Sequence, residues 1–397
     1  MNRYDFDQLP DRRATESLKW LYYEKDVLPM WVADMDFRSP QPVIDALHRR
    51  IEHGVFGYPL MDDHLSETPG LCDLIVNWLA EHYRWHISPE DITYLPGVVT
   101  GFNLACHTFA APGGGVLVQT PVYTPILKAA EHTGVIHHEM ELIHDEGGRY
   151  AVDLDTFRES ITTDTRLIIL CNPHNPVGKV FSKQELEQMA EVCLDKGVLI
   201  CSDEIHCELV YQGYRHVPIA SLDPEIAQNT ITLMSPSKTF NLAGLQCSFA
   251  VIQNPELRQK YLAARKGLVP WVNLMGLVAA KAAYEQGQSW LDQVLVYLEA
   301  NRDYLADFVG NELPGIAMAK PEATYLAWLD CRQTGIDGNP YRFFLEQGRI
   351  AFNDGATFGK GGEGFVRLNF GCPRSMLKGC LMRMKEVMEM QSEQPIR

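Results

Sequence analysis

Four short apolar runs, each followed closely by a polar or aromatic side chain, constrain the fold of this chain most strongly. The runs have β-type composition and lie at 116–118, 167–170, 198–201 and 231–234. The groups that follow them are Tyr123, Asn172 with Asn175, Asp203 and Lys238. In an open α/β sheet, ligands bind outside the carboxyl ends of the strands. The pattern therefore predicts an α/β fold with a mostly parallel sheet, and a crevice where these groups meet.

The segment from 167 to 201 contains the clearest local unit. Its first apolar run leads into an Asn-Pro loop and then to Ser182, with Glu185 three residues later, which is a capping box. Apolar residues recur at helical spacing until Gly197, a residue typical of helix C-termini, and the next apolar run follows at once. This order predicts a β-α-β unit in a parallel sheet.

The chain has 397 residues, which is long for one core and suggests two domains. Further helices are expected from near Ser39 and around 255–266, 275–310 and 376–390, and shorter strands at 324–329 and 364–370. We therefore expect a large cofactor-binding α/β domain at 45–285 and a small α+β domain at 286–397, with an N-terminal segment, 1–44, that packs on the small domain.

Composition excludes several classes of protein. The chain has 35 basic and 51 acidic residues, a net charge of −16, and no basic block, so nucleic-acid binding is disfavoured. No apolar stretch approaches the length of a membrane span, and the first residues lack the apolar core of a signal peptide. Ten scattered cysteines without a CxxC pair indicate reduced thiols rather than disulfides or zinc. We expect a cytoplasmic protein that binds a small molecule.

Lys238 and Asp203 together suggest a pyridoxal 5′-phosphate site. This cofactor needs a lysine that forms a Schiff base with its aldehyde, and a carboxylate that keeps its pyridine nitrogen protonated so that the ring withdraws electrons. Each residue also has a plainer interpretation. Most lysines are solvated surface charges, and Asp203 could cap a helix that starts at Glu204.

Asn175 and Tyr123 fit two further needs of the cofactor ring. The Asn175 amide is expected to donate to the ring phenolate, and the Tyr123 ring to cover one face. Arg367, on a short strand, is the candidate for holding a substrate carboxylate in a bidentate pair. Each of these residues has an alternative interpretation. Asn175 could be a turn residue, Tyr123 could pack in the hydrophobic core, and Arg367 could form a surface ion pair.

The cofactor phosphate needs backbone N–H groups at a helix start and hydroxyl groups. Val98 and Val99, in a Gly-Val-Val-Thr-Gly stretch ahead of an amphipathic segment, are the candidates for the first need. Ser235 and Ser237 are the candidates for the second.

These features resemble the fold-type I pyridoxal-phosphate superfamily, the aspartate aminotransferase-like enzymes. Within it they resemble the MalY/PatB type of cystathionine β-lyase, also called C–S lyase. The matching stretches span nearly the whole chain and lie at 30–37, 57–59, 172–178, 202–206, 235–245 and 367–374. The lysine loop and the Asn-Pro loop identify the superfamily. The opening Trp-Val-Ala-Asp-Met-Asp-Phe, the Asp-Glu-Ile-His and the closing Arg-Leu-Asn-Phe-Gly-Cys-Pro-Arg indicate the subgroup.

The resemblance implies a lyase that cleaves cystathionine or a related sulfur amino acid to a thiol, pyruvate and ammonia. It implies a homodimer with the active site at the interface, where Tyr58 reaches the partner chain's cofactor phosphate. It also implies that His206 lies near the cofactor, where plainer aminotransferases often have tyrosine. The chain departs from the subgroup's pattern in a longer stretch at 59–78, and in Glu208 where aspartate is expected.

Other functions remain open at this stage. An aminotransferase would use the same groups, because both reactions begin with loss of the Cα proton. The stretch from Asp203 to His206 also resembles the DExH box of helicases, but the chain contains no GxxxxGK[ST] loop. A metal site formed by Asp203, His206 and Glu208 has weak support at that spacing. Some relatives bind transcription factors, although nothing in this sequence identifies such a surface.

Overall fold

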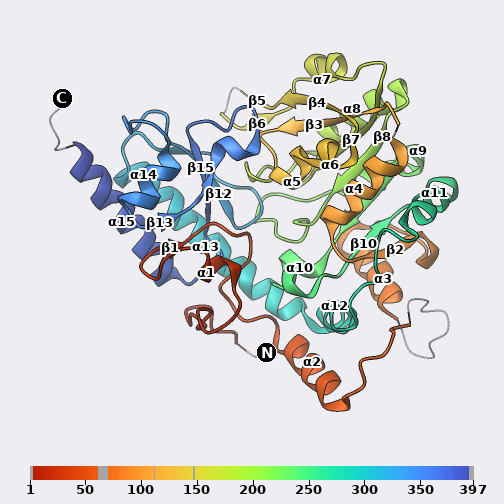
Figure 1. The fold of residues 1–397 in the computed structure, drawn as a ribbon, viewed down its shortest axis with the longest axis horizontal. Coiled ribbons are helices and arrows are strands. Elements are labelled where there is room, and N and C mark those ends of the chain that lie inside the picture. Colours follow the sequence, from red (N-terminus) through yellow and green to blue (C-terminus); the bar gives the residue numbers. More distant parts are fainter. Residues whose placement is uncertain (1–2, 61–69, 111, 146–147, 393–397) are drawn as a thin grey trace.

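A seven-stranded sheet forms the centre of the computed structural model, which describes residues 3–60, 70–110, 112–145 and 148–392 (Figure 1). The neighbouring strands in order are β2 (Ile92–Leu95), β10 (Ser248–Val251), β9 (Thr230–Met234), β8 (Leu199–Asp203), β7 (Thr165–Cys171), β3 (Gly115–Thr120) and β4 (Ile136–Glu141). Every pair is parallel except the two made by β10. The predicted mostly parallel sheet is confirmed.

The register of the three middle strands aligns their carboxyl ends. Cys171 of β7 lies opposite Asp203 of β8, and Asp203 lies opposite Leu233 of β9. The segments that follow these strands therefore begin at the same edge of the sheet.

Alternation along the strands explains why helices cover both faces of the sheet. Val116, Val118, Leu167 and Ile169 belong to one apolar cluster, whereas Leu117, Ile168 and Leu170 belong to another. Helices α4 (Val98–Phe109) and α11 (Pro255–Arg265) contribute to the first cluster, and α7 (Leu154–Ser160) and α8 (Lys183–Lys196) to the second. Strands buried on both faces read as continuous apolar runs, which is why they are visible in the sequence.

The predicted β-α-β unit is confirmed at both ends of its helix. Ser182 is the N-cap of α8, and its side chain accepts a hydrogen bond from the Glu185 amide while Glu185 bonds back to the Ser182 amide. The helix ends at Gly197, which has a left-handed backbone with φ of 65°. Gly197 tolerates this conformation because it has no Cβ.

A second, four-stranded antiparallel sheet lies in the C-terminal part of the chain. Its order is β11 (Ala317–Met318), β12 (Leu326–Asp330), β15 (Phe365–Asn369) and β14 (Asn353–Asp354). Around it are α13 (Gln288–Glu312), drawn in cyan in Figure 1, and α14 (Pro340–Glu346) and α15 (Arg374–Ser392), drawn in blue. The N-terminal residues also lie here, because β1 (Leu28–Pro29) pairs with β13 (Ile350–Ala351).

The helical region expected at 275–310 is two helices, α12 (Leu274–Gln286) and α13, divided at Gly287. A Cβ at Gly287 would lie 2.4 Å from the Ala283 carbonyl oxygen and 2.6 Å from the Phe240 ring. Close packing against Phe240 therefore makes glycine necessary at the division, and helical spacing alone does not reveal it.

The remaining elements are short or lie outside the two main sheets. The helices are α1 (Leu18–Leu21), α2 (Gln41–His53), α3 (Leu71–Tyr83), α5 (Thr124–Leu127), α6 (Ala129–Thr133), α9 (Pro224–Gln228) and α10 (Pro236–Thr239), and the strands are β5 (Ile143–His144) and β6 (Tyr150–Ala151). Within the described residues, no helix combines the length and apolar character that a membrane crossing requires. Part of the stretch at 59–78, which the sequence predicts to be longer than in the subgroup, lies outside the described residues, namely residues 61–69.

Candidate active site

A cavity of about 160 Å³ lies where β7, β8 and β9 end. Most of the predicted site residues line it: Val98, Val99, Tyr123, Asn175, Asp203, His206, Ser235, Ser237 and Lys238. The expected convergence at the carboxyl ends of the strands is therefore observed for these residues. Asn172 is an exception, because it is fully buried and its Oδ1 accepts a hydrogen bond from the Phe181 amide at 3.1 Å. It holds the Asn-Pro loop instead of facing the cavity.

Lys238 reaches the cavity from α10, a short helix directly after β9. Its Nζ donates a hydrogen bond of 2.7 Å to the carbonyl oxygen of Ala33, in the segment 31–37, which we call the N-terminal loop. Burial lowers the pKa of Lys238 to about 8, and the negative charge of Asp34 partly opposes this effect. A lysine with this pKa is partly unprotonated near neutral pH, as a proton acceptor must be.

Asp203 ends β8 and is buried, with 4% of its surface exposed. Burial raises the pKa of its carboxyl to about 7, although the Ile205 amide donates a hydrogen bond to it at 3.1 Å. It has no ion-pair partner among the described residues, and it precedes a turn rather than the helix that it could have capped. The charge of Lys238 favours the charged form of this carboxyl but does not outweigh burial. The protonated nitrogen of a pyridine ring would supply a directly paired cation.

His206 lies next to these two groups. Its ring is buried, and its Nδ1 has no hydrogen-bond partner among the described residues. Burial and then the charges of Lys238 and Arg367 hold its pKa well below the usual value. It is therefore neutral at physiological pH. Glu208 points elsewhere, since its Oε2 accepts hydrogen bonds from Thr239 and Cys207. The three residues of the metal hypothesis do not converge, and no metal-binding cluster is found in the described part of the chain.

Arg367 lies beside the cavity on β15 and is held by three acceptors. Its Nη1 donates to Asn175 Oδ1 at 2.9 Å, and its Nη2 donates to Asn353 Oδ1 at 2.6 Å and to the Trp31 carbonyl at 3.2 Å. Burial lowers its pKa to about 10, so it stays charged near neutral pH. Within the part of the chain that the structure describes, its Nε has no partner. A buried cation without a carboxylate partner among the described residues suits a substrate carboxylate.

The phosphate candidates lie at two helix starts. Gly97 is the N-cap of α4, so Val98 and Val99 are its first residues, with amide groups that lack partners within the helix. Ser235 caps α10, since its Oγ accepts from the Ser237 amide at 3.1 Å and donates to the Cys247 carbonyl at 2.7 Å. Ser237, whose hydroxyl contacts Ser235 Oγ, is the freer of the two serines.

Tyr58 lies outside this cavity and is 92% exposed. Its ring meets Trp271 edge-on, with centroids 5.6 Å apart, in a neighbouring hollow of about 700 Å³. Pro96 and Gln246 line both cavities, so the exposed tyrosine adjoins the mouth of the candidate site.

Volume alone does not identify the site. A hollow of about 590 Å³ lies away from the ends of β8 and β9, beside Arg149, Lys179 and Glu322. Its charged groups are paired, Arg149 with Glu322 and Lys179 with Glu185. The smaller cavity contains the buried groups with unmet partners and shifted pKa values, which are typical of functional sites.

Sequence reasoning assigned no role to Ala33 or Asn369. Asn369 is fully buried, and its Nδ2 donates to the carbonyls of Val32 and Asp34. Its position two residues after Arg367 on one strand places both on the same face, a signal that was available. Ala33 contributes through its carbonyl, and no side-chain pattern reveals that.

Comparisons with known proteins agree with this geometry. The model of the family described as aminotransferase class I and II matches residues 25–383. Cystathionine β-lyase PatB of Bacillus subtilis is 40% identical over 96% of this chain and 99% of its own length. Protein MalY of Escherichia coli is 34% identical over 94% of this chain and 96% of its own. The crystal structure of cystalysin from Treponema denticola, which contains pyridoxal 5′-phosphate, superposes with a TM-score of 0.92 at 30% identity, covering 98% of this chain and all of that one.

Proposed function

The chain belongs to the class I and II aminotransferase family, and on that premise we propose that it is a pyridoxal-phosphate-dependent carbon–sulfur β-lyase. It cleaves cystathionine or a related sulfur amino acid to a thiol, pyruvate and ammonia. The choice of elimination over transamination depends on the 40% identity to a cystathionine β-lyase over almost the whole chain. The groups in the cavity serve both reactions.

The residues of the cavity fit the cofactor. Asp203 would hold the protonated ring nitrogen, Asn175 would donate to the ring oxygen, and Tyr123 would cover the ring. The amides of Val98 and Val99 and the hydroxyl of Ser237 would hold the phosphate, with Ser235 supporting Ser237. When bound, the cofactor supplies an electron sink for the negative charge that forms at Cα.

Lys238 is the proton acceptor in this proposal. Its amine takes the proton from Cα, and its lowered pKa keeps a useful fraction of it neutral near pH 8. The electron pair left at Cα then allows the Cβ–S bond to break, and the sulfur leaves as a thiolate. Water hydrolyses the remaining enamine to pyruvate and ammonia.

Arg367 binds the substrate carboxylate and thereby fixes Cα near Lys238. Asn175, Asn353 and the Trp31 carbonyl hold the guanidinium, so little conformational freedom is lost when the substrate binds. His206 is neutral and adds no charge to the binding site.

A product assay tests this proposal. Purified enzyme incubated with cystathionine and no keto acid should release thiol and pyruvate in equal amounts over many turnovers. Transamination is the second candidate, because the matching family model describes aminotransferases. Conversion of the bound cofactor to its amine form, once per site and without thiol, would establish transamination instead.

We also propose that the enzyme is a cytoplasmic homodimer in which Tyr58 completes the partner's phosphate site. Tyr58 and Trp271 are large, exposed aromatic side chains beside the mouth of the cavity, as expected for a surface that a second copy covers. All ten cysteines lie within the described residues, where they are buried and form no disulfide, which suits a reducing compartment.

Mixing two inactive variants tests the shared site. A dimer of one Tyr58→Ala chain and one Lys238→Ala chain contains one site with both residues intact, so activity should return after subunit exchange. If each chain supplied its own tyrosine, the mixture would stay inactive.

A further inference from the structure

The N-terminal loop, residues 31–37, is held over the Lys238 amine by side chains from three parts of the chain. Asn241, three residues after Lys238, bonds to the backbone of Met35 and Phe37, and Asn369 bonds to the carbonyls of Val32 and Asp34. Between these carbonyls lies that of Ala33, which accepts hydrogen bonds from Lys238 at 2.7 Å and from the Tyr325 hydroxyl at 2.9 Å. The loop therefore fixes the acceptor of the free amine.

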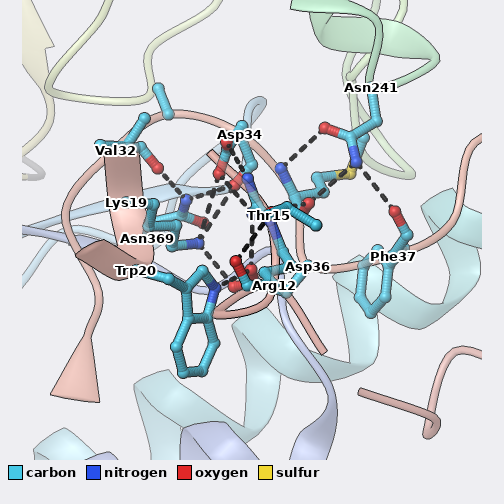
Figure 2. A network of polar contacts seen from close by, with 12 residues as sticks. Arg12, Thr15, Lys19, Trp20, Val32, Asp34, Asp36, Phe37, Asn241 and Asn369 are labelled. Atoms are coloured by element: carbon cyan, nitrogen blue, oxygen red, sulfur yellow. Dashed lines mark hydrogen bonds and ion pairs between the residues drawn. The ribbon is translucent and has the colours of Figure 1, made fainter. Parts of the chain in front are cut away.

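The loop is also tied to the N-terminal residues by charge (Figure 2). Arg12 holds Asp34 with two hydrogen bonds, Nη1 to Oδ1 at 3.0 Å and Nη2 to Oδ2 at 2.6 Å. Asp36 is fully buried and receives Arg12 at 2.7 Å, Lys19 at 2.6 Å and the Trp20 indole at 2.8 Å. Two cations and two carboxylates balance, so the cluster is neutral.

The two carboxylates have different surroundings. The Asp36 carboxylate bonds to Arg12, Lys19 and Trp20, whereas Asp34, next to Ala33, also acts on Lys238. The other groups that act on Lys238 come from different elements: Arg367 on β15, Asp203 at the end of β8, and the neutral His206 after it. Among these charges Asp34 has the largest effect on the pKa of Lys238, and it opposes the effects of burial and of Arg367.

We propose that Asp34 and Arg12 form a positioning pair, which fixes the Ala33 carbonyl and one negative charge beside the Lys238 amine. The inference deepens the proposed function, because it concerns the proton acceptor of that reaction. The Asp34 charge stabilises the protonated amine, and Arg12 limits that effect by neutralising Asp34 and holding it in place. Lys19, with its Nζ 3.7 Å from Asp34 Oδ1, contributes to the neutralisation.

Two substitutions with opposite expected signs test the pair. In Asp34→Asn the negative charge is lost while the shape stays, so the pKa of Lys238 should fall by about one pH unit. In Arg12→Gln a neutralising cation is lost, so the pKa should rise by a smaller amount. Arg13→Gln is the matched control, because the Arg13 guanidinium donates to the backbone carbonyls of Trp20, Lys25 and Val27 and forms no ion pair with any described residue. It should leave the pKa unchanged.

The pKa is measured in the full chain freed of cofactor. Competitive acetylation across a pH series, with mass spectrometry of the Lys238 peptide, reports how much of the amine is unprotonated at each pH. Opposite shifts in the two variants, with none in Arg13→Gln, support the pair. If the pKa of Lys238 shifts in the same direction in both variants, the proposed pair is wrong. It is also wrong if the pKa does not shift in variants that unfold cooperatively and are therefore folded. If Asp34→Asn does not fold, the upward shift in Arg12→Gln decides alone. The measurement needs no substrate, so it stands whether the enzyme eliminates or transaminates.

Discussion

The two sides of the cavity are built in different ways. On the strand-end side, Asn175, Asp203 and Lys238 follow neighbouring parallel strands, and the sheet fixes their positions through its backbone hydrogen bonds. On the opposite side, the N-terminal loop and Arg367 are held by side chains that bond across long sequence separations. The comparison indicates that the sheet holds the reactive side chains of the strand-end side rigidly. The N-terminal loop and Arg367 depend instead on a network of side-chain hydrogen bonds, which a single substitution can weaken.

The largest expected effect is on the strand-end side. Lys238→Ala removes the proton acceptor and the amine that anchors the cofactor, so kcat for thiol release should fall by about 10³-fold or more. The cofactor-free chain should not lose thermal stability, because the lowered pKa of Lys238 means that its buried amine opposes folding near neutral pH, and its removal offsets the lost hydrogen bond to Ala33. A variant that keeps more than a tenth of the activity would show that another group takes the proton.

Asp203→Asn, on the same side of the cavity, should weaken cofactor binding but raise the free energy of unfolding. The folded carboxyl has a pKa of about 7, above the ordinary 3.8, so it binds its proton more tightly when folded. Above pH 7 it therefore opposes folding, by up to about 4 kcal/mol, and this cost disappears as the pH falls toward 4.

The asparagine variant should thus raise the free energy of unfolding of the cofactor-free chain at pH 8, with a smaller gain at pH 5, while cofactor affinity falls. Urea denaturation at both pH values measures the gain. Asp153→Asn is the control, because Asp153 caps α7 at the surface and its pKa is lowered by its bonds to Thr156. An equal gain in the control, or a gain that does not depend on pH, would contradict the explanation.

Arg367→Lys tests the opposite side of the cavity. A lysine keeps the charge but loses the planar fork that contacts Asn175, Asn353 and the substrate carboxylate. KM for cystathionine should therefore rise by about 10- to 100-fold, with a smaller change in kcat. Arg332→Lys is the control. Arg332 forms a surface ion pair with Asp330, the last residue of β12 in the same sheet, so this variant should leave KM unchanged. An unchanged KM in the Arg367 variant would mean that another group binds the carboxylate.

The same contrast explains what could be predicted from the sequence. The strand-end residues were predictable because each follows its own apolar run, and the α8 capping box is likewise local in sequence. The other side was predictable only in part: the need for a bidentate cation on a short strand indicated Arg367, but not the residues that hold it. Its hydrogen bonds join residues 205 positions apart for Lys238 and Ala33, and 337 apart for Asn369 and Val32. No local spacing encodes such pairs, and backbone acceptors leave no mark in the sequence.

The smallest predicted effect compares Asn369, which holds the N-terminal loop, with Ser182, the N-cap of α8 beside the main sheet. Asn369→Ala removes both donors to the N-terminal loop and leaves two carbonyls without their partner, which should cost about 1–3 kcal/mol of unfolding free energy. Ser182→Ala removes the α8 cap and should cost about 1 kcal/mol. Urea denaturation measures both.

The substrate constants then distinguish the two sides. Because Asn369 holds the loop that contacts Lys238 and Arg367, its loss should also raise KM for cystathionine, whereas the Ser182 variant should keep the KM of the original enzyme. If the two variants lost stability equally and neither changed KM, the N-terminal loop would be as firmly fixed as the sheet, and the contrast between the two sides would not hold.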